Sequence, residues 1–243
     1  MKTESQAARR SRIYRIRTLG GLRREVEGCT ACPRLREYCS EVARKKRAAY
    51  REQEYWGAPV PSFGDENARI LLMGLAPGAH GSNRTGRMFT GDASGNFLYA
   101  ALHRVGLASQ AEAIDRNDGM RLRDVYISAV GRCAPPGNKP LPQELTRCLP
   151  FQAREFSLLP RLKVVVCLGK IAFDWTWKTL EEHGVVLGSP RPRFAHNAVY
   201  TLGGAFPTVL ASYHPSQQNT QTGRFTASMI DEVLARAKEL AAL

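Results

Sequence analysis

The segment RILLMGLAP, residues 69–77, decides the fold class of this chain. Its run ILLM is apolar at every position instead of every second one, which is the pattern of a strand buried on both faces of a sheet. Three further runs have the same character: VYISAV at 125–130, KVVVCL at 163–168 and TVLASY at 208–213. We therefore predict a central sheet of parallel strands.

Longer segments with a helical pattern separate and follow these runs. They are GNFLYAALHRVG (95–106), PQELTRCLPFQAREFSLLP (142–160), KIAFDWTWKTLEEHG (170–184) and RFTASMIDEVLARAKELAAL (224–243). This alternation predicts an α/β fold with helices on both faces of the sheet. In such folds the binding crevice lies beyond the carboxyl ends of the strands, so we expect the site in the loops after Met73, Val130, Leu168 and Tyr213.

The chain has 243 residues, enough for one large domain with a sizeable core. It contains neither an internal repeat nor a low-complexity linker, so we expect a single α/β domain over residues 21–243. Residues 1–20 are polar and rich in arginine, and we expect a flexible basic arm there that can lie along phosphates. A terminus without function is the alternative.

The charge of the chain indicates its class of partner. Lys and Arg number 35 against 22 Asp and Glu, which gives a net charge of +13 and a pI near 9.8. This imbalance favours nucleic acid over a membrane surface, because no basic helix with a bulky apolar face is present. No run approaches the roughly 18 apolar residues of a membrane span, and no signal-peptide core follows the N-terminal charges. We expect a cytoplasmic, nucleoid-associated monomer.

Six cysteines without a secretory signal indicate metal ligands or buried thiols rather than disulfides. Cys29 and Cys32 form a C-x2-C pair, a spacing that lets two thiolates hold one metal. Cys133 and Cys148 lie far downstream and form no second close pair, which favours a [4Fe–4S] cluster over a zinc ribbon. The remaining cysteines are Cys39, a reserve ligand, and Cys167, a small buried side chain within a strand.

The loop after the first strand is rich in glycine. GLAPGAHGSNRTGRMFTGDASGNF, residues 74–97, matches neither G-x-x-x-x-G-K-[ST] nor G-x-G-x-x-G, so we do not expect a nucleotide cofactor. Its glycines instead permit close approach of the backbone to a ligand. Phe89 is an aromatic residue in a polar setting, and Asp92 is the only carboxylate of the loop. Asp92 is either the N-cap of the next helix or a functional carboxylate.

A histidine follows the last strand. In SYHPSQQNTQTGRFT, residues 212–226, Pro215 rigidifies the turn after His214, and several amide side chains follow. A histidine at the carboxyl end of a strand, in a polar loop, is a better site candidate than one on an apolar face. A role in capping the turn is the alternative.

Three motifs together carry a resemblance to a known family. GLAPGAHGSNRTGRMFTGD (74–92), the cysteines flanking CAPPGNKP (133–140) and HPSQQNTQTGRFT (214–226) resemble family 5 of the uracil-DNA glycosylase superfamily. The iron–sulfur enzymes of family 4 look similar, but they have a Glu where this chain has Leu75 and an Asn where it has Ala129. The resemblance extends from Cys29 to the C-terminus.

This resemblance implies a three-layer α/β/α fold with a central four-stranded parallel sheet. It also implies a structural [4Fe–4S] cluster on Cys29, Cys32, Cys133 and Cys148. The implied activity is that of a monofunctional DNA-repair glycosylase, which flips a damaged base out of the duplex and hydrolyses its N-glycosidic bond, leaving an abasic site.

Breaking an N-glycosidic bond builds positive charge on the sugar and negative charge on the departing base. A catalyst should therefore hold an anion near the sugar and a donor near the base carbonyl. Asp92 fits the first demand and would also position the attacking water, and a neutral His214 fits the second. Phe89 matches by position the aromatic residue of the family that stacks on the flipped base.

Further loop residues complete the expected site. Asn138, and with lower priority Asn83, offer an amide to the base edge or to water. Because apolar Leu75 and Ala129 replace polar residues, the resemblance implies substrates beyond uracil, such as hypoxanthine and hydroxymethyluracil. The remaining expected contacts are Gly74 and Ala76 with the base, and Gln217, Gln218 and Asn219 in the gap that the extruded nucleotide leaves.

Two alternatives stay open. The chain could be a non-catalytic iron–sulfur module that binds nucleic acid, with glycine-rich loops that grip phosphates. Zinc could also replace the cluster, in which case the protein would be colourless.

A sliding clamp is a candidate partner for the basic arm.

Overall fold

A computed structural model describes residues 5–243. Its sheet has six strands in the order β1-β3-β2-β4-β6-β5. The strands are β1 (Phe63–Gly64), β2 (Ile70–Gly74), β3 (Val125–Ala129), β4 (Val164–Leu168), β5 (Val199–Tyr200) and β6 (Thr208–Ser212). The four central strands are parallel, whereas β1 and β5 pair antiparallel at the two edges. The predicted fold class is confirmed, but the number of strands was wrong, because the edge strands span two residues each and leave no apolar run.

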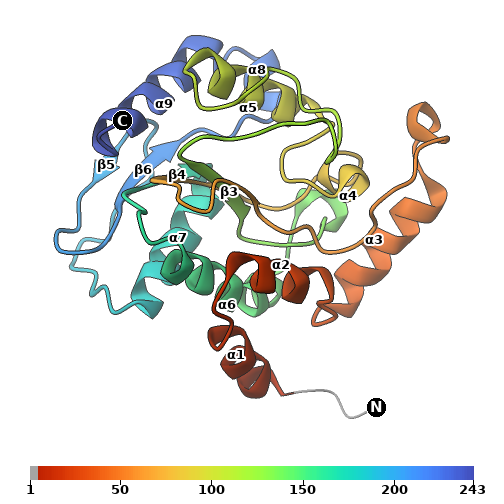
Figure 1. Ribbon diagram of the computed structural model, residues 1–243, viewed down its shortest axis with the longest axis horizontal. Coiled ribbons are helices and arrows are strands. Elements are labelled where there is room, and N and C mark those ends of the chain that lie inside the picture. The colour runs from red at the N-terminus through yellow and green to blue at the C-terminus, as the bar shows by residue number, and fades with distance from the viewer. Residues whose placement is uncertain (1–4) are drawn as a thin grey trace.

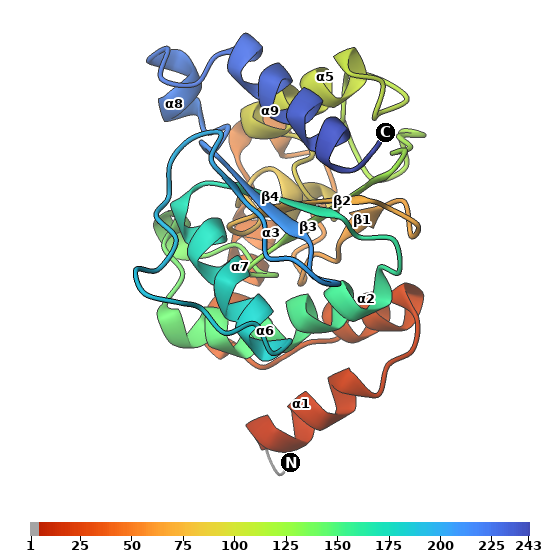
Figure 2. The ribbon, with the colours of Figure 1, turned by 90° about the vertical axis from the view of Figure 1, so that its left-hand side faces the viewer.

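Helices cover both faces of this sheet (Figure 1, Figure 2). They are α1 (Gln6–Tyr14), α2 (Leu19–Glu27), α3 (Pro33–Lys45), α4 (Ser82–Thr85), α5 (Ala93–Arg104), α6 (Pro142–Leu158), α7 (Lys170–Glu182), α8 (Gln217–Gln221) and α9 (Ala227–Leu240), with 3-10 turns η1 (Ala48–Tyr50) and η2 (Pro136–Asn138). Among residues 5–243, no helix is long and apolar enough to cross a membrane.

Alternate residues of the central strands point into two separate cores. Ile70 and Leu72 of β2 pack with α5 and α9 on one face, in a cluster that includes Leu98 and Ile230. The intervening Leu71 and Met73 pack with α6 and α7 on the other face. All these side chains are fully buried, because parallel strands covered by helices have no solvent face.

The N-terminal segment is helical and packed wherever the structure describes it. In α1, Ser5 caps the helix by accepting a hydrogen bond from the backbone amide of Ala8. Ile13 is fully buried with Leu22 of α2 and Phe151 of α6. The predicted flexible arm is therefore wrong for residues 5–20, because Arg9 and Ile13 share the buried face of α1, which packs on α6. Residues 1–4 of that arm lie outside the described residues.

Candidate active site

A cavity of about 760 Å³ opens where β2, β3 and β6 end. The loops after these strands meet there, as the topology rule for parallel sheets predicts. Two apolar residues, Leu75 and Ala129, contribute to its wall. The residues proposed from the sequence that line this cavity are Ala76, Phe89, Asp92, Asn138, His214, Gln217 and Gln218.

Asp92 is the N-cap of α5 and also lines the cavity. As N-cap of α5, its Oδ1 accepts a hydrogen bond of 2.9 Å from the amide of Gly95. Its Oδ2 lies so close to Gly81 that a Cβ there would stand 1.9 Å away. Burial raises the pKa of Asp92, and amide hydrogen bonds together with the charge of Arg84 oppose this rise. The carboxylate is thus held rigidly at the cavity wall.

Phe89 is held in an unusual backbone conformation. Its φ of +52° lies in the left-handed region, which costs a non-glycine residue on the order of 1–3 kcal/mol. The ring lies over the last residue of β2: a Cβ on Gly74 would stand 2.7 Å from it. The centroid of the ring is 6.1 Å from that of His214. Gly74 therefore makes room for an aromatic wall of the cavity.

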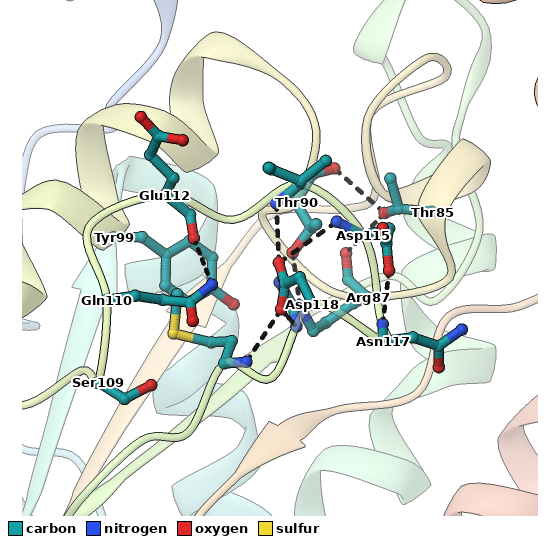
Figure 3. Close-up of polar contacts among 12 residues, drawn as sticks. Thr85, Arg87, Thr90, Tyr99, Ser109, Gln110, Glu112, Asp115, Asn117 and Asp118 are labelled. Carbon is teal, nitrogen blue, oxygen red and sulfur yellow. Dashed lines mark hydrogen bonds and ion pairs between the residues drawn. The ribbon is translucent and has the colours of Figure 1, made fainter.

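A network on the far side of the loop supports this strained segment (Figure 3). Arg87 donates two hydrogen bonds, of 2.7 and 2.6 Å, to the carboxylate of Asp118, and its Nε donates to Thr90 at 2.9 Å. Asp118 also accepts from the amides of Ile114 and Met120. Although burial opposes ionisation, the Arg87 hydrogen bond and the amides hold the pKa of Asp118 at about 2. Arg87 thus joins Thr90 in its own loop to Asp118 in the loop before β3, which fixes residues 87–90.

His214 faces the cavity in its neutral form. Burial lowers the pKa of its imidazole to about 4, so the ring carries no charge at neutral pH. Two neighbours position it: Asn219 donates from Nδ2 to the carbonyl of His214 at 2.9 Å, and a Cβ on Gly169 would stand 3.2 Å from the His214 side chain. The loop after β4 thus contributes support, and the loop after β6 contributes the histidine that lines the cavity.

Three sequence-predicted residues do not line the cavity. Asn83 is completely buried and donates from Nδ2 to the carbonyl of Cys39 at 3.3 Å. Gly74 lies beneath the ring of Phe89, and Asn219 holds the His214 loop. The predicted base contacts of Asn83 and Gly74 do not fit this arrangement, because protein atoms cover both residues.

Three residues that no motif singled out also line the cavity: Arg47, Tyr50 and His80. His80 is the only histidine of the glycine-rich loop and could have been selected on that ground. Arg47 and Tyr50 follow α3, far from the loop motifs in sequence, so no local pattern pointed to them.

The four proposed cluster ligands come from three segments of the chain. Cys29 and Cys32 lie between α2 and α3, Cys133 follows β3, and Cys148 is in α6. Burial raises the pKa of the Cys148 thiol to about 12, and the charges of Cys29 and Cys32 add to this effect. All cysteines of residues 5–243 are free, and no group of three or more Cys, His, Asp or Glu side chains there is arranged to hold a metal ion.

Arginines surround these thiols. Arg9 donates to Sγ of Cys29 at 3.3 Å. Burial raises the pKa of Cys32, and the nearby Arg147 opposes this rise. Both arginines line a second cavity, of about 490 Å³, together with Cys29. Cys39, the reserve ligand, is fully buried, and its thiol donates to the carbonyl of Ala134 at 3.5 Å. By chemical type, though not by the arrangement of the side chains, four thiols near cations match the ligands of an anionic iron–sulfur cluster.

Comparison with known proteins gives a consistent result. The model of the Uracil DNA glycosylase superfamily matches residues 61–238. A Type-5 uracil-DNA glycosylase of Thermus thermophilus is 54% identical over 218 residues, which cover 90% of this chain and 96% of the relative. One of Mycobacterium tuberculosis is 47% identical over 219 residues, covering 90% and 80%. A Type-4 uracil-DNA glycosylase of Archaeoglobus fulgidus is 31% identical over 160 residues, covering 65% and 70%. The sequence identity to these type-5 relatives is thus higher than to the type-4 relative, and the aligned segment is longer. The differences at Leu75 and Ala129 predicted this preference.

Proposed function

Because the chain belongs to the uracil-DNA glycosylase superfamily, we propose that it excises uracil from DNA as a type-5 uracil-DNA glycosylase. It hydrolyses the N-glycosidic bond and leaves an abasic site. One observation carries the proposal: a carboxylate, a neutral imidazole and an aromatic ring line the same cavity at the carboxyl ends of the strands. These are the groups that the cleavage of a flipped nucleotide requires.

The charges of the transition state assign a role to each group. The carboxylate of Asp92 stabilises the positive charge that develops on the sugar and orients the attacking water. The imidazole of His214 donates a hydrogen bond to the base carbonyl as negative charge develops there. Its pKa of about 4 keeps the ring neutral at neutral pH, and a neutral imidazole still carries one N–H group that can donate. Phe89 stacks on the base and keeps it out of water.

The mouth of the cavity supports contacts with the duplex. Gln217 and Gln218 begin the short helix α8 and are exposed, and Asn138 is exposed on η2. We assign Gln217 and Gln218 to the gap that the extruded nucleotide leaves, where unstacking costs a few kcal/mol. Asn138 contacts the base edge or the water through its amide.

The wall of the cavity favours a broad choice of bases. Leu75 and Ala129 line it, and neither side chain offers a hydrogen bond to a base. A polar side chain at these positions would reject bases that leave it unpaired. We infer that the enzyme also accepts hypoxanthine and hydroxymethyluracil.

A panel of duplexes with one lesion each tests both parts of this proposal. We expect abasic sites from uracil, hypoxanthine and hydroxymethyluracil, measured as strand breaks after alkali. The variant Ala129→Asn should keep uracil excision and lower the relative rate on hypoxanthine by about tenfold or more, because an unpaired amide is costly in a closed pocket. Binding of uracil-containing DNA without any abasic product would instead favour the non-catalytic module. Cleavage of uracil alone would reject the broad specificity.

We propose further that Cys29, Cys32, Cys133 and Cys148 bind a [4Fe–4S] cluster. The donor set and the nearby guanidinium groups of Arg9 and Arg147 support it. Bound there, the cluster would supply a rigid cross-link between the segment before α3, the loop after β3 and helix α6. This loop carries Asn138, so the cross-link would keep one side of the cavity in place.

Iron analysis and visible absorption test the cluster. We expect brown protein with about four iron atoms per chain, and Cys148→Ser should lose most of the iron and the colour. Cys167→Ser is the matched control, because Cys167 is equally buried but lies within β4, where its thiol donates to Thr176. Colourless protein with one bound zinc would reject the cluster. Loss of iron in Cys39→Ser, with iron retained in Cys148→Ser, would replace one proposed ligand by the reserve.

A further inference from the structure

We propose that Arg47 and His80, on the cavity wall that they share with Tyr50, form a binding site for one backbone phosphate of the DNA strand beside the extruded nucleotide. The proposal rests on the proposed function, because it names a contact of the same cavity. All three residues line this cavity together with Asp92 and Phe89.

Arg47 belongs to a basic segment, RKKRAAYR at residues 44–51, that begins in the last turn of α3 and continues beyond it. Its side chain is exposed and makes no hydrogen bond or ion pair with residues 5–243, whereas Lys45 pairs with Glu41 and Lys46 with the carbonyl of Arg51. The positive charge of Arg47 acts on a residue of the cavity wall, because it contributes to the lowered pKa of His80. Arg47 is therefore a cation at the wall that is available to an anionic ligand.

His80 presents an N–H group beside this cation. The hydroxyl of Tyr55 accepts from the amide of Arg47 at 3.4 Å and lies 3.1 Å from Nδ1 of His80. Tyr55 is buried, and donating its proton to Nδ1 satisfies both groups. Burial, with the charges of Arg47 and Arg84, lowers the pKa of His80, which favours the neutral ring. With Nδ1 accepting from Tyr55, the proton of the neutral ring is on Nε2.

Arg84 makes this wall one rigid unit with the Asp92 loop. Its guanidinium lies 4.0 Å from the centre of the Tyr50 ring, and its Nε donates to the carbonyl of His80 at 2.8 Å. Its Nη2 donates to the carbonyl of Gly91 at 2.7 Å, one residue before Asp92. A ligand bound at the wall is thereby held at a fixed place relative to the carboxylate.

The chemistry of the wall matches a phosphate better than a base. A base needs an aromatic face and paired donors and acceptors, which Phe89, His214 and Asn138 offer on other parts of the cavity. An unpaired guanidinium with a neighbouring N–H donor is a typical arrangement for a phosphate oxygen. A flipped nucleotide places its sugar between base and phosphate, so with the sugar at Asp92 a flanking phosphate must lie close by. The cation also offsets the repulsion between this phosphate and the Asp92 carboxylate.

Methylphosphonate substitution tests the contact directly, because it removes the charge of one phosphate at a time. The probe is a duplex with 2′-fluoro-2′-deoxyuridine, which resists cleavage, and single neutral linkages on either side of it. We expect one linkage whose neutralisation weakens wild-type binding about tenfold and leaves the affinity of Arg47→Ala unchanged. Arg47→Ala should also make the plot of log K against log [salt] shallower by about 0.9. At the same linkage, neutralisation should also leave the affinity of His80→Ala unchanged.

The control is Arg161→Ala, which removes an exposed arginine just before β4, at the amino ends of the parallel strands and so opposite the cavity. It should behave as wild type at every linkage. Equal losses in wild type and Arg47→Ala at all linkages would overturn the proposal. Uracil excision by wild type on unmodified duplex is measured in parallel. If wild type does not excise uracil, the proposed function is rejected. If it excises uracil normally but the losses of affinity from Arg47→Ala and from each neutral linkage simply add, only the phosphate site is rejected.

Discussion

Asp92→Asn is expected to lower the rate of uracil excision by about 10³-fold, the loss typical of removing one preorganised electrostatic group from an active site. Asparagine is as good an N-cap as aspartate, so the hydrogen bond to the amide of Gly95 and helix α5 should persist. The substitution thus separates the two roles of Asp92. Single-turnover excision with saturating enzyme measures the rate, and thermal unfolding checks the fold.

The pH dependence of the excision rate is an independent test of the Asp92 carboxylate. The ionised carboxylate is the active form, so the wild-type rate should fall as pH decreases through the pKa of Asp92. Burial raises this pKa, so the fall should begin at a higher pH than for an ordinary aspartate. Duplex affinity should remain close to wild type in Asp92→Asn. An unchanged excision rate would transfer the catalytic role to another group, and a large loss of thermal stability would show that the cap and not the charge matters.

The sequence predicted the parts of the site that are local. A strand buried on both faces has a continuous apolar run, and its carboxyl end locates the loop to search. For this reason the sequence alone singles out Phe89, Asp92 and His214, and the fold brings all three to one cavity. Their backbone support could not be predicted in the same way, because the contact of Arg87 with Asp118 joins residues 31 positions apart.

Polar character alone was a poor guide to exposure. Asn83 looks like a site residue in sequence, but it is fully buried and satisfies the carbonyl of Cys39. The opposite error concerns residues 5–20, where abundant arginines concealed a helix that buries Ile13. In both cases a few contacts between residues far apart in the sequence determine which side chains are buried. Such contacts produce no periodic pattern of apolar residues, so burial could not be predicted there.

Glu155→Leu is expected to lower the free energy of unfolding by about 3–5 kcal/mol, the usual cost of removing one partner from a buried ion pair. Arg132 and Glu155 are 1% and 2% exposed and lie 2.7 Å apart, which leaves the guanidinium no access to water. Glu155 also accepts hydrogen bonds from Ser62 and Ser128. One carboxylate therefore joins α6 to the segment before β1 and to β3.

Urea unfolding of three variants distinguishes an unpaired buried charge from a simple loss of packing. Glu181→Gln is the control, since its pair with Arg191 is exposed and should contribute less than about 1 kcal/mol. The double variant Arg132→Met with Glu155→Leu should recover most of the stability, because no charge then remains buried. A double variant as unstable as Glu155→Leu would mean that packing and not charge is responsible. Arg132 directly precedes Cys133, a ligand of the proposed cluster. If the double variant recovers stability and has the same iron content as wild type, the charge pair is not needed to form that site.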